Sequence, residues 1–402
     1  MRSWKLIGLV VLAGVVSALC CSSTRAAVVY GWGAAPVGDG ANASRSIPTL
    51  VDALSNPTMT ASGGLHSLAL LSDGTVQSWG YNGGGAVGDG STTRRLSPVP
   101  VVSLSGVVSL AAGGYHSLAV REDGTVRAWG YNGDGELGDG TTTNRLTPVS
   151  VSGLTSVASV AASHGHSLAL RADGTVRAWG FNGGGQLGDG TTTRRLLPVS
   201  VTGLTNVTAI AAGRDHSLAL RSDGTVRAWG FNGDGQLGDG TTTNRSAPIQ
   251  VSGLSNVVSV AGGTLHSLAA LSDGTVRSWG RNVYGQLGDG STTDRFTPIL
   301  VPGLSNIVEV EAVLYSSFAL SADGRLWSWG WNSVGELGLG DIVDRLLPTE
   351  VVAPSGYRFD SISGGGGGRT LLAMLSPIPA PGTMAVLMVG GLAVSNRRRE
   401  SR

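Results

Sequence analysis

Cysteine is almost absent from this chain, which limits the disulfide and thiolate chemistry that it can have. The only two cysteines, Cys20 and Cys21, lie within the first 26 of 402 residues. We interpret residues 1–26 as a secretory signal peptide, because Arg2 and Lys5 precede a mostly apolar stretch that ends near a small residue, Ala26. A lipoprotein signal is the alternative, but it fits poorly because a bulky leucine precedes the cysteines. Cleavage after residue 26 leaves a mature chain without disulfides or thiolates, so packing must stabilise it.

Charge is also scarce. Charged residues make up 14% of the chain and the net charge is +1, so no nucleic-acid partner is expected. Prolines number only 15 beside 64 glycines, and apolar residues are plentiful, which excludes collagen-like and disordered chains. No segment has helical periodicity over a useful length. Short apolar runs between glycines indicate strands joined by tight turns.

The C-terminal segment, residues 377–402, has the pattern of a sorting or anchoring tail. A Pro-Ala-Pro box precedes the apolar stretch from Thr383 to Val394, and three arginines follow. The stretch is shorter than the roughly 20 residues that span a bilayer as a helix. The segment resembles the bacterial PEP-CTERM sorting signal, with alanine where that family has glutamate. The resemblance implies transient membrane association and processing by an exosortase-type enzyme. A short unprocessed hydrophobic tail is the alternative.

A repeat of 50 residues dominates the rest of the chain. A Trp-Gly pair recurs at this step from Trp79 to Trp329, and a His-Ser pair recurs from His66 to His266. Each unit contains four short strand-like runs, two of them joined by an Asp-Gly turn such as Asp173-Gly174. Four short strands in each unit are typical of one blade of a β-propeller.

The two ends of the repeat complement each other. Val28 to Gly33 contains a seventh Trp-Gly pair without a preceding hairpin partner, whereas Arg369 to Leu375 has no Trp-Gly strand after it. We expect these segments to pair and close an all-β, seven-bladed propeller over residues 27–376, since closure protects the sheet edges.

The repeat has a recognisable family pattern. The stretch "AAGRDHSLALRSDGTVRAWGFNGDGQLGDG" resembles the repeat of the regulator of chromosome condensation family, and the resemblance extends over about residues 30–375. It implies a seven-bladed propeller. Members of that family include an exchange factor for a small nuclear GTPase and a secreted β-lactamase inhibitor, which both act on protein partners through a propeller face. The expected export of this chain argues against the nuclear role.

The glycine-rich loop "WGYNGDGELGDG" admits three interpretations. A dinucleotide-binding G-x-G-x-x-G must open a helix, but threonines and a proline follow here. Asn132, Asp134 and Glu136 alternate like the start of a calcium loop, but no glutamate closes it at the twelfth position. We favour a structural connection in which Asp139 and Arg145 form an ion pair. No cofactor or metal is predicted, although calcium on one or two loops stays open.

Catalytic residues are not apparent. The repeated histidines are predicted to be structural and to bond backbone carbonyls, because the hub of a seven-bladed ring is too wide for them to share one metal. The recurrent aspartates precede glycine in hairpins, where aspartate forms turns. No clustered, non-repeating carboxylates are expected at the hub either. We therefore predict that the protein is not an enzyme.

The candidate binding residues are those that break the repeat. Varied side chains on the loops of a rigid ring are typical of a binding face, and drift at exposed positions is the alternative. The candidates for partner binding are Tyr131, Arg214, Asp215, Arg281, Tyr284 and Trp331.

The predicted function follows from compartment and fold. We expect an exported, monomeric protein-binding or scaffold module at the cell surface or outside the cell, with an unidentified extracellular or envelope protein as its partner. The alternatives are a polysaccharide-active enzyme or a carbohydrate-binding protein that uses aromatic residues. Those aromatic residues are Tyr81, Tyr131, Phe181 and Phe231.

Overall fold

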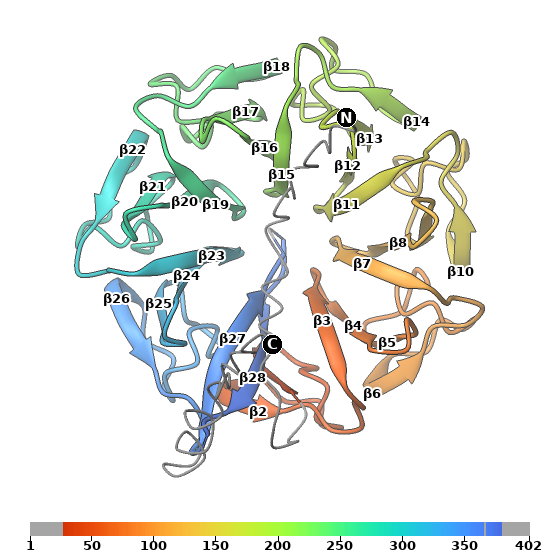
Figure 1. The fold of residues 1–402 in the computed structure, drawn as a ribbon, viewed down its shortest axis with the longest axis horizontal. Coiled ribbons are helices and arrows are strands. Elements are labelled where there is room, and N and C mark those ends of the chain that lie inside the picture. The colour runs from red at the N-terminus through yellow and green to blue at the C-terminus, as the bar shows by residue number, and fades with distance from the viewer. Residues whose placement is uncertain (1–26, 366, 380–402) are drawn as a thin grey trace, which may run out of the picture.

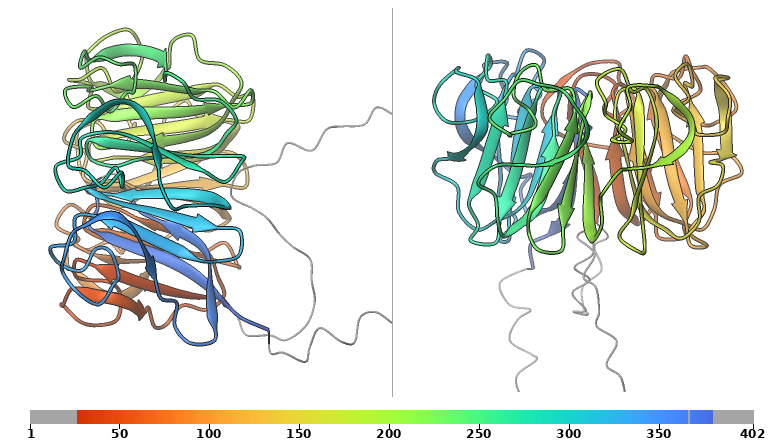
Figure 2. Two further views of the ribbon diagram at one scale, coloured as in Figure 1. Left: turned by 90° about the vertical axis from the view of Figure 1, so that its left-hand side faces the viewer. Right: turned by 90° about the horizontal axis from the view of Figure 1, so that it is seen from above.

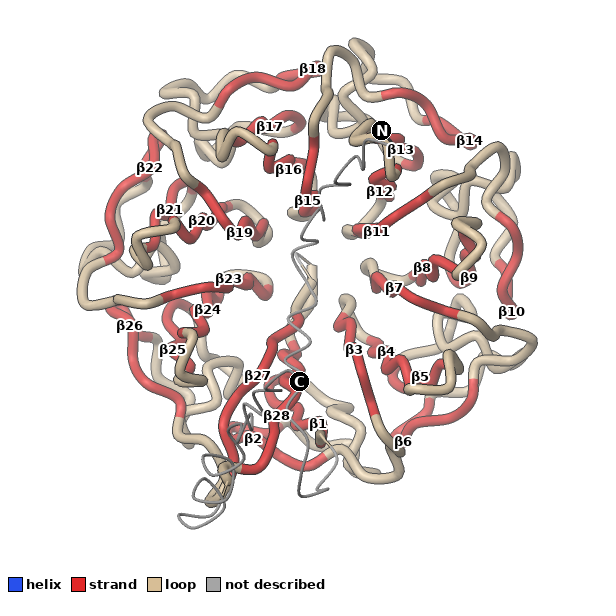
Figure 3. Tube along the Cα trace, viewed as in Figure 1, coloured by secondary structure: helices blue, strands red, loops and turns tan. Residues whose placement is uncertain are grey.

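The computed structural model describes residues 27–365 and 367–379. They form seven four-stranded antiparallel sheets arranged as blades around a ring (Figure 1). Side views show a disc of adjacent blades (Figure 2), and only strands and connections appear among the described residues (Figure 3). The expected all-β, seven-bladed propeller is confirmed. The predicted signal peptide and most of the predicted tail lie outside the described residues, among which no helix is long and apolar enough to cross a membrane.

Each blade runs from the hub to the rim in four strands. The innermost strands are β3 (Pro57–Ser62), β7 (Val107–Ala112), β11 (Val157–Ala162), β15 (Val207–Ala212), β19 (Val257–Gly262), β23 (Ile307–Val313) and β27 (Tyr357–Ser363). The second strands are β4 (His66–Leu71), β8 (His116–Arg121), β12 (His166–Arg171), β16 (His216–Arg221), β20 (His266–Leu271), β24 (Ser316–Ser321) and β28 (Thr370–Pro377). The third strands are β5 (Val76–Gly80), β9 (Val126–Gly130), β13 (Val176–Gly180), β17 (Val226–Gly230), β21 (Val276–Gly280), β25 (Leu326–Gly330) and β1 (Val28–Gly33). The rim strands are β6 (Arg95–Pro100), β10 (Arg145–Ser150), β14 (Arg195–Ser200), β18 (Arg245–Gln250), β22 (Arg295–Val301), β26 (Arg345–Val351) and β2 (Arg45–Leu50).

The ring closes through the blade that contains both ends of the repeat. Its strand order is β2-β1-β28-β27, and β1 pairs antiparallel with β28 from Val28 opposite Leu375 to Gly33 opposite Thr370. This confirms the predicted pairing of the N-terminal strand with the last repeat. Because β1 begins where β28 ends, both ends of the described propeller leave by the same face.

The buried tryptophans join neighbouring blades. Trp179 on β13 is fully buried and packs against apolar residues of the preceding blade, such as Leu118 and Val126. Its Nε1 donates to the carbonyl of Glu136, also in the preceding blade, over 2.7 Å. A large aromatic side chain with one satisfied polar atom contributes both apolar burial and direction. A buried tryptophan recurs in all seven blades, but the Nε1 hydrogen bond forms in five of them, since Nε1 of Trp32 and Trp79 has no partner.

The histidines also join blades, but not in the way predicted. His166 lies 2.9 Å through Nε2 from the Ser217 hydroxyl of the next blade, and Ser217 donates to the carbonyl of Gln186 over 2.9 Å. The same link recurs for His66, His116, His216 and His266. The prediction of direct bonds from histidine to backbone carbonyls is therefore wrong. A serine lies between the two groups, because the imidazole of one blade meets the His-Ser pair of the next.

Candidate binding face

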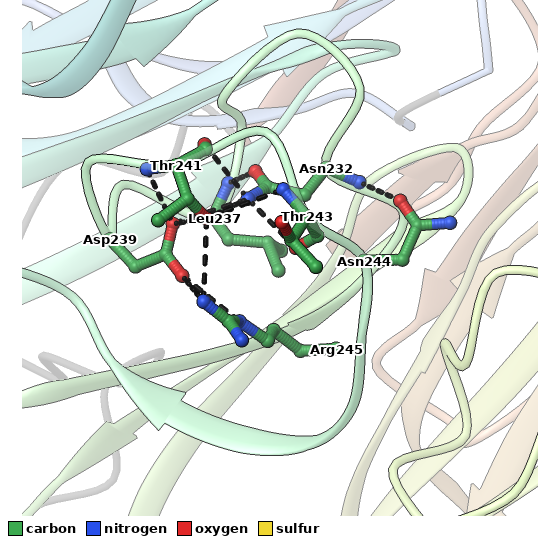
Figure 4. A network of polar contacts seen from close by, with 7 residues as sticks. All are labelled: Asn232, Leu237, Asp239, Thr241, Thr243, Asn244 and Arg245. Atoms are coloured by element: carbon green, nitrogen blue, oxygen red, sulfur yellow. Dashed lines mark hydrogen bonds and ion pairs between the residues drawn. The ribbon is translucent and has the colours of Figure 1, made fainter.

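The glycine-rich loops follow the third strands and hold themselves together (Figure 4). In the loop after β17, the buried Asn232 donates to the Asp239 carboxylate and to the carbonyls of Thr241 and Thr243, at 3.0–3.2 Å. Its side-chain oxygen accepts from the Leu237 backbone N–H over 2.9 Å. The Asn232 side chain therefore makes all of these hydrogen bonds within its own loop.

An ion pair completes each of these loops. The predicted pair of Asp139 with Arg145 is confirmed, with 2.7 Å between their charged groups. Burial alone would raise the pKa of Asp139, but hydrogen bonds from Thr141 and Arg145 lower it overall. Gly138 has a φ of 63°, and a Cβ there would lie 2.9 Å from Val151 and 3.0 Å from Trp179. The glycines therefore shape a compact connection, as favoured from the sequence.

The residues suggested by the calcium-loop pattern have other partners. The Asp134 carboxylate lies 3.5 Å from Arg194, and the Glu136 carboxylate accepts from the Asp134 backbone N–H over 2.9 Å. Within residues 27–365 and 367–379, no group of three or more His, Cys, Asp or Glu side chains is placed to hold a metal ion.

These loops share one face of the ring with the short turns that join the first and second strands. We call it the loop face. The glycine-rich loops and these short turns touch directly, since the Tyr131 backbone N–H donates to the Tyr115 carbonyl over 2.9 Å. The opposite face, which we call the hairpin face, carries the Asp-Gly turns. There Asp173 accepts hydrogen bonds from the backbone and hydroxyl of Thr175.

A pocket of about 910 Å³ opens on the loop face. Three of the six candidate residues line it: Tyr131, Arg214 and Asp215. Aromatic rings that the candidate set did not include complete the wall: Tyr81, Tyr115 and Phe181, together with the imidazole of His164. A pocket of this size that combines aromatic side chains with several polar and charged groups is suited to binding a ligand.

The other three candidates form a separate group across the ring. The rings of Tyr284 and Trp331 lie 5.8 Å apart between centroids, and Tyr315 packs against both. Arg281 lies 3.4 Å from the Asp234 carboxylate. A smaller pocket of about 250 Å³, lined by Arg214 and Arg369 among others, lies between the two groups.

Burial perturbs the ionisable groups of the large pocket. It raises the pKa of Glu136 to about 7 and also raises the pKa of Asp215, despite the nearby Arg214 and His164. It lowers the pKa of His164, and Arg214 adds to that effect. Glu136 is 1% exposed, and this burial disfavours its charged form.

The hub contains two carboxylates that sequence reasoning missed. Glu309 and Glu311 are two residues apart on β23, and Glu311 lines a narrow central channel of about 180 Å³ that is otherwise mostly lined by alanine and other small residues. Burial raises the pKa of Glu309 to about 7, and it raises the pKa of Glu311 well above the usual range. Backbone N–H groups, including that of Ala312, bond these carboxyl groups. The expectation of a hub without non-repeating carboxylates is wrong.

The other overlooked residues also occupy repeat positions. Tyr115, Tyr315 and Arg369 stand where other units have leucine, glycine or aspartate. Glu136, which the sequence suggested only as part of a calcium loop, stands where three units have glutamine. Comparing every repeat position across the units would have identified them.

The ring has seven four-stranded blades, long loops that hydrogen-bond within themselves, and varied side chains on its loop face. These features define one class of β-propeller. The RCC1-like domain model matches residues 28–371, and the chain belongs to that family. No curated protein matches it.

Solved structures agree with the fold. Prp20p from Saccharomyces cerevisiae, studied for its binding to Gsp1p and histones, is 26% identical, with a TM-score of 0.78 over 89% of this chain and 93% of its own. Yeast RCC1 (Prp20) bound to Kap60 is 25% identical, with a TM-score of 0.77 over 92% and 97%. Human WBSCR16 is 23% identical, with a TM-score of 0.78 over 88% and 100%, and this shows the fold alone.

Proposed function

We propose that this protein is a non-enzymatic binding module, exported to the bacterial cell surface or beyond, that holds a protein partner on its loop face. Family membership supports the binding role, since yeast Prp20 has been studied with the proteins Gsp1p, histones and Kap60. The observation that carries the proposal is the pocket of about 910 Å³, where the repeat loses its symmetry.

The position of the chain ends supports presentation at a surface. Val28 and Leu375 pair at the hairpin-face end of their strands, whereas Gly33 and Thr370 pair at the loop-face end. A tail that follows residue 379 as a membrane anchor would therefore leave the loop face free for a partner.

A pull-down from envelope and secreted fractions tests this function. One variant carries Tyr131→Ala, Arg214→Ala and Asp215→Ala, and a second carries Arg281→Ala, Tyr284→Ala and Trp331→Ala. We expect one saturable protein partner that at least one loop-face variant fails to retain. A control with Arg171→Ala and Arg221→Ala on the hairpin face should retain it. A partner that all three variants retain equally would contradict the proposal.

Carbohydrate binding is the second candidate, because the aromatic residues Tyr81, Tyr131 and Phe181 are 38–42% exposed on the same face. A glycan array with the Tyr131→Ala variant as control tests it. Shortened polysaccharide products would instead favour an enzyme, and Glu309 and Glu311 would then be the carboxylates to replace.

A further inference from the structure

The last blade holds a cation of its own on the loop face. The guanidinium of Arg369 lies 4.5 Å from the centroid of the Trp331 ring and 2.8 Å from the carboxylate of Glu336. The Glu336 side chain is fully buried, and its other oxygen accepts from the Val334 backbone N–H over 2.8 Å. An aromatic ring above and a carboxylate beside it are a favourable site for a guanidinium.

The same framework recurs in the blade of β7 to β10. Tyr131 occupies the repeat position of Trp331, and Glu136 occupies that of Glu336. The Glu136 carboxylate has the same orientation, since one oxygen accepts from the Asp134 backbone N–H over 2.9 Å. Among the described residues, no arginine or lysine forms an ion pair with Glu136.

The sites beside Glu336 and Glu136 differ in the residue that precedes the second strand of the next blade. Arg369 immediately precedes the second strand of the next blade, and its carbonyl accepts from Ala34 as that of Gly165 accepts from Phe181. Gly165 is therefore the counterpart of Arg369 beside Glu136, and it has no side chain. Both Gly165 and Glu136 line the pocket of about 910 Å³.

The surroundings suit a positive ligand. Tyr115, Tyr131 and Phe181 supply aromatic rings, whose faces attract cations. Asp134 and Asp215 also line the pocket, but each is already paired with an arginine, Arg194 or Arg214, at 3.5 and 3.6 Å. Glu136, which has no cationic partner among the described residues, is therefore the carboxylate with which a guanidinium would pair.

We propose that this pocket receives an arginine side chain from the protein partner, with its guanidinium beside Glu136 and against Tyr131, in the place that Arg369 fills in the last blade. Arginine fits better than lysine because its planar fork both stacks on a ring and bonds a carboxylate. This inference rests on the proposed function and names the chemistry that the partner presents.

The direct test uses an end-blocked Gly-Arg-Gly peptide and its neutral isostere Gly-citrulline-Gly, with binding to the full chain followed by NMR titration. We expect the arginine peptide to bind at least tenfold more tightly than the citrulline peptide, with Gly-Lys-Gly in between. Equal binding of the arginine and citrulline peptides, or no binding of the arginine peptide, would overturn the inference.

Two substitutions locate the site. Glu136→Gln should weaken arginine-peptide binding at least tenfold and leave the fold intact, because glutamine stands at this position in Gln186, Gln236 and Gln286. Glu336→Gln is the matched control and should leave binding unchanged. Gly165→Arg should block the pocket with an internal guanidinium, since a Cβ there meets only Phe181 at 3.2 Å. Wild-type binding by Glu136→Gln would refute the assignment.

The outcomes separate this inference from the proposed function. A captured partner that the arginine peptide displaces supports both. A partner lost from the loop-face variants but not displaced by a saturating arginine peptide overturns only the inference. Peptide binding at Glu136 without any protein partner leaves the site standing and counts against the proposed function.

Discussion

At the scale of single residues, the repeated histidines and serines link one blade to the next. Ser217 donates its only hydroxyl proton to the Gln186 carbonyl, so it must accept from Nε2–H of His166. The histidine is therefore held in one tautomer. A buried imidazole with this geometry serves packing rather than chemistry.

Replacing the serine tests the link. We expect Ser217→Ala to lower the free energy of unfolding by about 1–3 kcal/mol, because the buried Nε2–H of His166 loses its acceptor. Urea denaturation at neutral pH measures the change. Ser252→Ala, at an exposed position, should change the free energy of unfolding by less than about 0.5 kcal/mol. Equal losses in both variants would show that the link does not stabilise the fold.

The hub glutamates Glu309 and Glu311 make the folded protein less stable as pH rises. Their pKa values in the folded protein lie above the usual 4.5, so the folded protein keeps protons that the unfolded chain releases as pH rises. Stability is therefore lost from about pH 4.5 upward, through pH 7 for Glu309.

Amide variants should remove that loss. We expect Glu309→Gln and Glu311→Gln to raise the free energy of unfolding at pH 8 by on the order of 1 kcal/mol or more, and by less at pH 5. Denaturation at both pH values measures the difference, with exposed Glu122→Gln as the control. A gain that is the same at pH 5 and pH 8 would mean that ionisation of these groups is not what costs stability.

At the scale of elements, six of the seven long loops depend on one asparagine, and the loop after β1 has Ala35 at that position. Asn232→Ala should lower the free energy of unfolding by about 2–4 kcal/mol, because several buried polar groups lose their partner together. The control is Asn244→Ala, which removes only the acceptor for the Asn232 backbone N–H, and position 194 of another unit holds arginine instead. Thermal unfolding compares the two. A smaller loss for Asn232→Ala than for Asn244→Ala would contradict this account of the loop.

The strands and loops were more predictable than the site. Strand order and closure follow from repeated positions such as Trp179 and from the unpaired Val28 to Gly33, since each blade repeats the same local rules. Glu136, Gly165 and Tyr115 meet only because successive blades place loops from different units side by side. Their significance depends on contacts between units, and spacing within one unit does not show it.

At the scale of the whole molecule, the five linking histidines make the ring sensitive to acid. Burial lowers the pKa of His66 to about 4 and those of His116, His166, His216 and His266 to about 3. Below the usual value of 6.5, the unfolded chain binds protons that the folded ring excludes. Stability should therefore fall as pH falls from about 6.5 towards 3.

The expected slope is at most about 1.4 kcal/mol per pH unit for each histidine, and buried glutamates with raised pKa values, such as Glu309, offset part of it above pH 4.5. Urea denaturation between pH 4 and 7 measures the slope. Replacing one link with His166→Gln should reduce the slope by about one histidine's share. A stability that does not change across this range in the unmodified protein would contradict the buried, neutral histidines.

Closure of the ring also determines how it responds to tension. The seam joins β1 to β28, and its two free ends leave side by side at the Val28–Leu375 pair. A pull on both ends loads one pair of residues at a time, from this edge towards Gly33 and Thr370, so the seam unzips instead of shearing. The other blades have no free end to peel. A ring with seven equivalent sheets thus has one mechanically weak joint, at the place where the chain meets itself.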